Sequence, residues 1–201
     1  PYMEALADLA AADGGDVLEI GFGLALSGSR VQTHKNVTSH TIIEANAEVF
    51  QELEKFAETE DKAGRPRVIP LKGFWVDVLE RLKEQGVQYD AILYDPYPQN
   101  ESEQHLHQFL FMNAAMELLK SGGKFVYCNL TSIGKLKESF STWEELWTKS
   151  QVPYLTSKLC GFKPEKISYS LFAFSDEVKR VRDECEYYMH DHALCPVCIK
   201  S

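Results

Sequence analysis

The chain has 201 residues, 44% of them hydrophobic and 25% charged, the balance of an ordinary soluble globular protein, and no apolar run approaches the ~20 residues that cross a bilayer. Its net charge of −9 disfavours nucleic acid and anionic membranes as partners, because both select basic surfaces. Five irregularly spaced cysteines are typical of reduced thiols rather than of a disulfide framework, so we expect one cytoplasmic domain that spans residues 1–201.

Short apolar runs alternate with amphipathic stretches in the larger, N-terminal part of the chain. Strands are predicted at residues 16–20, 41–44, 67–71, 89–95 and 124–130. Helices are predicted at residues 47–59, 76–85 and 105–120, the last of them ending at Ser121-Gly122-Gly123. The continuous apolar run at residues 91–93 is typical of a strand buried on both faces of a parallel sheet. This alternation predicts right-handed βαβ units in an open, doubly wound sheet.

The pattern changes after about residue 150. Two further strands are predicted at residues 167–174 and 185–189, joined by a charged segment at 176–184 that has no apolar helical face. Neighbouring strands with such a connection favour an antiparallel pair. The predicted fold class is therefore α/β, with a doubly wound, mostly parallel seven-stranded sheet and a C-terminal antiparallel strand pair.

A glycine turn, Gly21-Phe22-Gly23, follows the first predicted strand. In open α/β sheets ligands bind beyond the carboxyl ends of the strands, and two glycines there let the backbone approach a ligand closely. The dinucleotide fingerprint would need a third glycine at position 26, where Leu26 stands, and this weakens a nicotinamide or flavin interpretation. Glu19, two positions before the first glycine, is instead typical of adenosylmethionine methyltransferases. The alternative interpretation is a tight turn with no ligand.

Glu44 ends the second predicted strand, about 20 residues beyond the glycine turn. A carboxylate at this offset can accept hydrogen bonds from both hydroxyl groups of a ribose. The alternative is a solvated acid at the end of a strand. Together with the glycine turn, Glu44 indicates a nucleoside site.

Asp95-Pro96-Tyr97-Pro98 ends the fourth predicted strand. Its prolines restrict the backbone and remove N–H donors, so that carbonyls, a carboxylate and an aromatic face remain at one place. This combination suits a cationic or amine-bearing group. It is similar to the [Asp/Asn]-Pro-Pro-Tyr pattern of amine methyltransferases, with Tyr97 and Pro98 exchanged. The alternative is a turn made rigid by proline.

Small polar residues, Thr131 and Ser132 among them, follow the fifth predicted strand. They could offer hydroxyls and backbone amides to a carboxylate, although a helix cap or a turn explains them equally well. His105 and His107 are interpreted as structural. The tail that contains Cys195 and Cys198 has one Cys-x-x-Cys pair, and we expect no metal there.

With these features in order, the chain resembles the guanidinoacetate N-methyltransferase family. The matching runs are residues 1–3, 17–23, 42–46, 68–75, 92–98, 105–109, 127–132 and 151–153. The resemblance implies a Rossmann-like methyltransferase fold and S-adenosylmethionine as cofactor. It implies that a methyl group is transferred to the guanidino nitrogen of guanidinoacetate, giving creatine and S-adenosylhomocysteine. It also implies a monomer or homodimer whose partner is a small guanidino substrate.

The resemblance also assigns roles to residues. Those expected around the cofactor are Met3, Glu19, Gly21, Phe22, Gly23, Leu24, Ala25, Leu26, Ser27, Glu44, Ala45, Asn46, Gly73, Trp75, Val76 and Asp95. Asp95 is expected to hold and deprotonate the guanidino group as the catalytic residue. Tyr97, Thr131 and Ser132 are expected to contact the substrate, the last two at its carboxylate.

Some expectations set this chain apart from the family pattern. The family carries a second guanidino-binding glutamate and a segment that partly covers the cofactor, both of which would precede Pro1, so we expect an N-terminal segment to be missing from the sequence. Pro96 and Ile133 stand where mammalian relatives have Thr and Trp. Three alternatives stay open: a methyltransferase for another amine or guanidine, such as a protein arginine side chain; a nicotinamide-dependent dehydrogenase; and a non-catalytic cofactor-binding protein.

Overall fold

A computed structural model describes residues 1–96, 110–128, 130–176, 178 and 190–201. Within them, one seven-stranded sheet has the order β3-β2-β1-β4-β5-β7-β6. The strands are β1 (Gly15–Ile20), β2 (Val37–Glu44), β3 (Arg67–Lys72), β4 (Tyr89–Tyr94), β5 (Leu119–Tyr127), β6 (Ile167–Ala173) and β7 (His192–Ile199). The first five strands pair in parallel, and β7 is antiparallel to both β5 and β6. The predicted fold class is confirmed.

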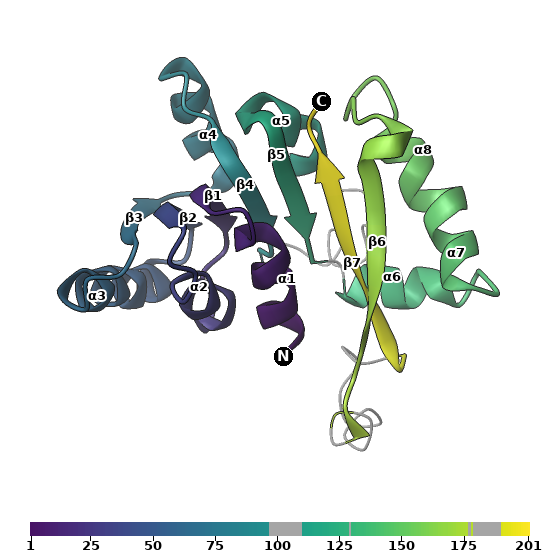
Figure 1. Cartoon of the computed structure of the whole chain (residues 1–201), viewed down its shortest axis with the longest axis horizontal. Coiled ribbons are helices and arrows are strands. Elements are labelled where there is room, and N and C mark those ends of the chain that lie inside the picture. Colours follow the sequence, from purple (N-terminus) through teal and green to yellow (C-terminus); the bar gives the residue numbers. More distant parts are fainter. Residues whose placement is uncertain (97–109, 129, 177, 179–189) are drawn as a thin grey trace.

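Helices cover both faces of this sheet (Figure 1). Their bounds are α1 (Tyr2–Ala11), α2 (Leu26–Val31), α3 (Ala47–Lys62), α4 (Trp75–Glu84), α5 (Phe111–Leu118), α6 (Leu130–Lys137), α7 (Trp143–Leu146) and α8 (Val152–Leu155). A π-helical turn at Trp147–Gln151 joins α7 to α8, and a 3-10 turn at Pro164–Lys166 precedes β6. The apolar residues of α1, α2 and α3 pack on one face, and those of α4, α5, α7 and α8 pack on the other. None of the helices in the described residues is long and apolar enough to span a bilayer.

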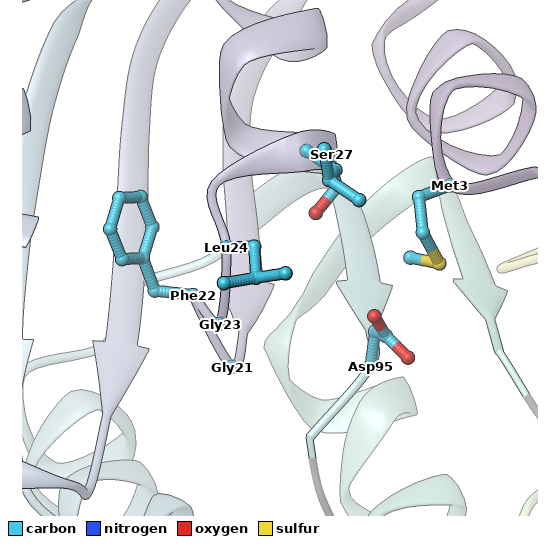
Figure 2. Close-up of a pocket in the computed structure, with 8 residues that line it drawn as sticks. Met3, Gly21, Phe22, Gly23, Leu24, Ser27 and Asp95 are labelled. Atoms are coloured by element: carbon cyan, nitrogen blue, oxygen red, sulfur yellow. The ribbon is translucent and has the colours of Figure 1, made fainter. Parts of the chain in front are cut away.

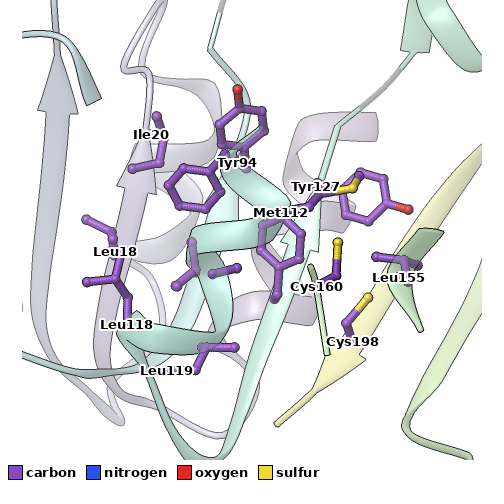
Figure 3. Packing of buried hydrophobic residues seen from close by; sticks show 14 of the residues in the cluster. Leu18, Ile20, Tyr94, Met112, Leu118, Leu119, Tyr127, Leu155, Cys160 and Cys198 are labelled. Atoms are coloured by element: carbon purple, nitrogen blue, oxygen red, sulfur yellow. The ribbon is translucent and has the colours of Figure 1, made fainter. Parts of the chain in front are cut away.

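The strands in the middle of the sheet are apolar on both faces, as the continuous run at residues 91–93 predicted. Val17 and Leu93 belong to the cluster that α1 covers. Leu18 and Ile92 point to the opposite face and join the larger cluster with α4 and α5 (Figure 3). Because successive side chains alternate between faces, this burial pins the register of the parallel strands.

The segment before β5 differs from the prediction. The helix ends at Leu118, and Ser121-Gly122-Gly123 lies inside β5 rather than forming a helix stop. The reason is tertiary: Gly122 N–H donates to the carbonyl of Lys200, and Lys200 N–H donates to the carbonyl of Gly123, both at 2.9 Å. The strand also ends at Tyr127, and residue 130 begins α6, so the predicted range 124–130 was wrong at both ends.

The last strand is also not where the sequence predicted it. Residues 185–189 lie outside the described residues, and β6 pairs instead with β7 at His192–Ile199. Pro196 argued against a central strand, because proline cannot donate to a ladder. Pairing with β5 covers only Val197, Cys198 and Ile199, so Pro196 stands just beyond that ladder.

Candidate active site

A pocket lies at the carboxyl edge of the sheet, where the loops after β1 and β4 meet the start of α1. Its lining residues are Met3, Gly21, Phe22, Gly23, Leu24, Leu26, Ser27 and Asp95. Figure 2 shows Met3, Ser27 and Asp95 on one side of the glycine turn, while the Phe22 ring lies on the other side. All of these residues are among those that the sequence assigned to the cofactor.

The glycine turn and the Asp95 loop are in direct contact. Gly21 has φ of 90°, and a Cβ atom there would lie 2.8 Å from the carbonyl oxygen of Asp95. The N–H of Asp95 donates to the carbonyl of Ile20 at 3.0 Å. A Cβ at Gly23 would meet nothing within 4 Å, so that side of the turn is open to a ligand. Only glycine at position 21 permits this close approach.

Glu44 joins the ends of β1 and β2. Its carboxylate accepts the backbone N–H of Phe22 at 2.9 Å and that of Asn46 at 2.7 Å. Asn46 in turn caps α3, its side chain accepting from the N–H groups of Glu48 and Val49. These bonds orient the Glu44 carboxylate, and each oxygen keeps a lone pair for a further donor such as a ribose hydroxyl.

Glu19 lies behind the glycine turn and is outside the set of residues that line the pocket. Its side chain is fully buried; one oxygen accepts the hydroxyl of Ser27, and the other is 2.8 Å from Nε2 of His40. Sequence reasoning missed His40, because the predicted second strand began only at residue 41. A histidine inside an apolar run was the signal that could have drawn attention to it.

Asp95 has the most perturbed titration of the carboxylates around the pocket. Burial raises the pKa of Asp95 from 3.8 to about 7; a hydrogen bond from the Cys128 thiol lowers this pKa, and the negative charge of Glu19 raises it. Tyr2 contacts Cys128 and donates to the carbonyl of Leu194 at 2.6 Å, which anchors α1 beside Asp95. Tyr2 and Cys128 are the supporting residues that sequence reasoning missed here.

Several predicted cofactor residues lie along the same edge of the sheet but outside the pocket lining. Gly73 N–H donates to the carbonyl of Glu44 at 3.0 Å, which places the β3–α4 turn beside the Glu44 loop. Trp75 packs edge-on against Tyr94, and Val76 is half exposed. Ala45 follows Glu44 in the same loop. Ala25 begins α2 with φ of 60°, so its backbone is left-handed although it is not glycine.

The predicted substrate residues are only partly visible. Tyr97, like His105 and His107, lies outside the described residues. Thr131 and Ser132 lie in the first turn of α6, directly after β5, and Ser132 is buried. Ile133 is buried in the large apolar cluster rather than placed along the pocket.

The cysteines of the C-terminal tail lie on opposite faces of the sheet. Cys195 packs in the cluster under α1, whereas Cys198 packs in the cluster under α5, because residues three apart on a strand point in opposite directions. Burial raises the pKa of the Cys195 thiol to about 11. Among the described residues, no group of three or more His, Cys, Asp and Glu side chains is arranged to hold a metal ion.

Comparisons with known proteins agree with this geometry. A family model for guanidinoacetate N-methyltransferase matches residues 1–201. The chain is 33% identical over 117 residues to protein arginine N-methyltransferase 2 of Yarrowia lipolytica, covering 58% of this chain and 23% of that protein. It is 26% identical over 176 residues to protein arginine N-methyltransferase 2 of Candida glabrata, covering 87% of this chain and 39% of that protein. The chain thus spans about a quarter to two fifths of the length of these curated relatives.

Solved structures share the fold at low identity. An O-methyltransferase from Bacillus cereus in complex with S-adenosylhomocysteine has a TM-score of 0.64 and 14% identity, covering 99% of this chain and 80% of that chain. The O-methyltransferase TomG from Streptomyces achromogenes in complex with S-adenosylmethionine also has a TM-score of 0.64 and 14% identity, covering 100% and 80%. Fold and family match together define the class of S-adenosylmethionine-dependent methyltransferases. The chain belongs to the guanidinoacetate N-methyltransferase family, whose model it matches from its first residue to its last.

Proposed function

We propose that the protein transfers a methyl group from S-adenosylmethionine to the guanidino nitrogen of guanidinoacetate, giving creatine and S-adenosylhomocysteine. The family match along the whole chain supports the substrate. The single observation that carries the chemistry is the position of Asp95, whose carboxylate lines the same pocket as the glycine turn. Donor and acceptor sites are thereby adjacent.

The residues of the pocket fit the cofactor. Glycine at position 23 leaves open space, so the backbone can approach the methionine part of the cofactor, and Glu44 presents a carboxylate oriented for the ribose. The cofactor supplies a methyl group on a cationic sulfonium, which becomes a neutral thioether when the methyl group leaves. Holding the acceptor in line with that methyl group could contribute up to about 7–11 kcal/mol in the best cases.

Asp95 answers the difficulty of the acceptor. A guanidinium has a pKa above ~12, and its delocalised nitrogens carry no free lone pair. An ionised Asp95 can hold the guanidinium by a charge-assisted hydrogen bond and take one N–H proton as the new carbon–nitrogen bond forms. A pKa of about 7 lets this carboxyl group keep the proton after the transfer.

The first turn of α6 suits the other end of the substrate. Cys128 N–H donates to the carbonyl of Tyr94 at 2.9 Å, so the chain that leads into α6 runs beside the Asp95 loop. Backbone N–H groups at the start of a helix favour an anion. We propose that Thr131 and Ser132 receive the carboxylate of guanidinoacetate there.

A second candidate is the arginine side chain of a protein. The curated relatives that match this chain carry the name protein arginine N-methyltransferase 2. Asp95 would hold an arginine guanidinium in the same way, but the carboxylate-binding turn would have no partner on a side chain buried in a polypeptide. The two candidates therefore differ in their need for Ser132.

An acceptor panel tests the proposal. The 201-residue chain, and in parallel the chain extended by any natural residues that precede Pro1, would be titrated with S-adenosylhomocysteine by calorimetry. Both would then be assayed with guanidinoacetate, free arginine, glycine and an arginine-containing peptide. We expect binding, with turnover confined to guanidinoacetate. Turnover on the peptide alone would replace the substrate, and failure to bind the cofactor product would remove the proposal altogether.

A further inference from the structure

Four buried polar side chains form a continuous row behind the glycine turn. Gln32, His40, Glu19 and Ser27 are 2%, 0%, 0% and 4% exposed. Gln32 Nε2 lies 3.2 Å from His40 Nδ1, His40 Nε2 lies 2.8 Å from Glu19 Oε2, and the Ser27 hydroxyl donates to Glu19 Oε1. Of these four, Ser27 lines the pocket, so the row runs from the pocket into the core.

The row determines where the protons are. An amide nitrogen can only donate, so Nδ1 of His40 must accept the hydrogen of Gln32. The proton of a neutral imidazole is then on Nε2, which donates it to Glu19. The hydroxyl of Ser27 is the other donor. Glu19 accepts from both neighbours and has no proton of its own to give, so it is an ionised carboxylate with two neutral partners.

This negative charge lies close to the pocket and has no cation beside it. In the part of the chain that the structure describes, no lysine or arginine forms an ion pair with Glu19; its charged-group contact is with His40. Gly28, one residue after the pocket residue Ser27, is so near that a Cβ atom would lie 3.5 Å from Glu19 Oε2. The charge of Glu19 also reaches Asp95, whose pKa it raises.

A buried carboxylate without a cation is costly, and a positive charge in the neighbouring pocket lowers that cost. We propose that Gln32 and His40 are positioning residues that keep Glu19 as a fixed negative charge behind Ser27, and that this charge makes the pocket prefer a cationic sulfonium over its neutral thioether product. The inference rests on the proposed use of S-adenosylmethionine. It explains how a site of this kind releases its product: once the methyl group has left, the ligand no longer carries the charge that Glu19 attracts.

Calorimetry with both ligands tests the charge. Wild type, Glu19→Gln and the control Glu60→Gln would each be titrated with S-adenosylmethionine and S-adenosylhomocysteine, without acceptor. Glu60 is a buried glutamate paired with Arg65 outside the pocket lining, so its variant removes an equal charge elsewhere. We expect Glu19→Gln to reduce the preference for the sulfonium by about tenfold, as for a charge acting over several ångströms in a protein. We expect Glu60→Gln to leave it unchanged.

The outcomes separate this inference from the proposed function. If neither ligand bound to wild type, the proposed function would fail. If both ligands bound and the ratio of their dissociation constants were the same in wild type and in folded Glu19→Gln, the role of Glu19 would be wrong while the cofactor site stood.

Nitrogen NMR of histidine-labelled wild type tests the row without relying on a variant that might not fold. We expect His40 to be a neutral imidazole with its proton on Nε2 at pH 7. An imidazolium would cancel the charge of Glu19 within the pair and overturn the inference. In Gln32→Leu we expect the His40 signals to move toward a mixture of protonation forms, and unchanged signals would remove Gln32 from the row.

Discussion

The two sides of the pocket hold their carboxylates in different ways. On the side of β1 and β2, Glu44 accepts two backbone N–H groups, and Glu19 accepts from Ser27 and His40. On the side of β4, Asp95 accepts from the Cys128 thiol, and burial outweighs that bond, so the pKa of Asp95 rises to about 7. The cofactor side is built from acceptors locked in place, whereas the acceptor side offers a group that can take and release a proton. This difference matches the two tasks of binding a charged donor and deprotonating an acceptor.

The largest expected effect comes from removing the group that exchanges the proton. Asp95→Asn keeps the size of the side chain but can neither hold the guanidinium by charge nor accept its proton. We expect kcat to fall at least about 10³-fold, within the range for a lost general base and its charge. Calorimetry should show S-adenosylhomocysteine binding within a few-fold of wild type. Asp13→Asn, an exposed aspartate paired with Lys124, serves as the control.

The same substitution should act on stability in the opposite direction. Burial disfavours the charged form of Asp95, so the variant should have a higher Tm than wild type at pH 8, where wild type is ionised. Near-normal turnover in Asp95→Asn would contradict the role proposed for this residue, whatever its stability.

The pH dependence sharpens the contrast between the two sides. The pKa of Asp95 is raised from 3.8 to about 7, so the residue is protonated below and ionised above that value, and kcat/KM should rise with pH through about 7. Between about pH 4 and 7 the folded state holds a proton that the unfolded state has lost, so the contribution of Asp95 to the free energy of unfolding falls as the pH rises. Because the charge of Glu19 raises this pKa, Glu19→Gln should shift the kinetic transition to lower pH. A profile flat from pH 5 to 8 would refute the assignment.

On the cofactor side, Glu44→Gln replaces a carboxylate that accepts from Phe22 and Asn46. An amide can accept at only one of the two positions, so a backbone N–H loses its partner and the ribose loses an acceptor. We expect the dissociation constant for S-adenosylhomocysteine to rise about 10- to 100-fold, corresponding to about 1–3 kcal/mol for an unsatisfied buried polar group. The control is Glu48→Gln on the exposed first turn of α3, where calorimetry should show no change. An equal loss in both variants would contradict a specific role for Glu44.

The smallest expected effect concerns the contact between the two sides. In Gly21→Ala, the added Cβ would lie 2.8 Å from the Asp95 carbonyl at a φ of 90°, so the loops must separate. We expect the free energy of unfolding to fall by about 1–3 kcal/mol in urea denaturation. Gly23→Ala, whose Cβ meets nothing within 4 Å, isolates the cost of the backbone conformation alone. Equal losses in the two variants would show that the contact with Asp95 costs nothing.

The sheet could be predicted from the sequence where burial alone decides the structure. The runs at β1 to β4 are apolar on both faces and are bounded by turns, so local pattern and final structure agree. The prediction failed where distant partners decide. Ser121-Gly122-Gly123 is strand because it pairs with Lys200, and β7 is strand although Pro196 argued against it.

The candidate site shows the same division. Gly21, Glu44 and Asp95 stand at the ends of strands, so their order along the chain placed them at one edge of the sheet, and the structure brings them together. His40, Gln32, Tyr2 and Cys128 take part through contacts between elements that are far apart in the sequence. No local motif distinguishes such residues from ordinary core positions until the fold has formed.

One measurement tests the central claim most directly. Wild type and Asp95→Asn would be incubated at pH 8 with guanidinoacetate and S-adenosylmethionine that carries a deuterated methyl group, and the products would be analysed by mass spectrometry. The account predicts creatine with the intact labelled methyl group on its nitrogen from wild type, and none above background from the variant. Labelled creatine from both proteins, or from neither while the cofactor is bound, would contradict it.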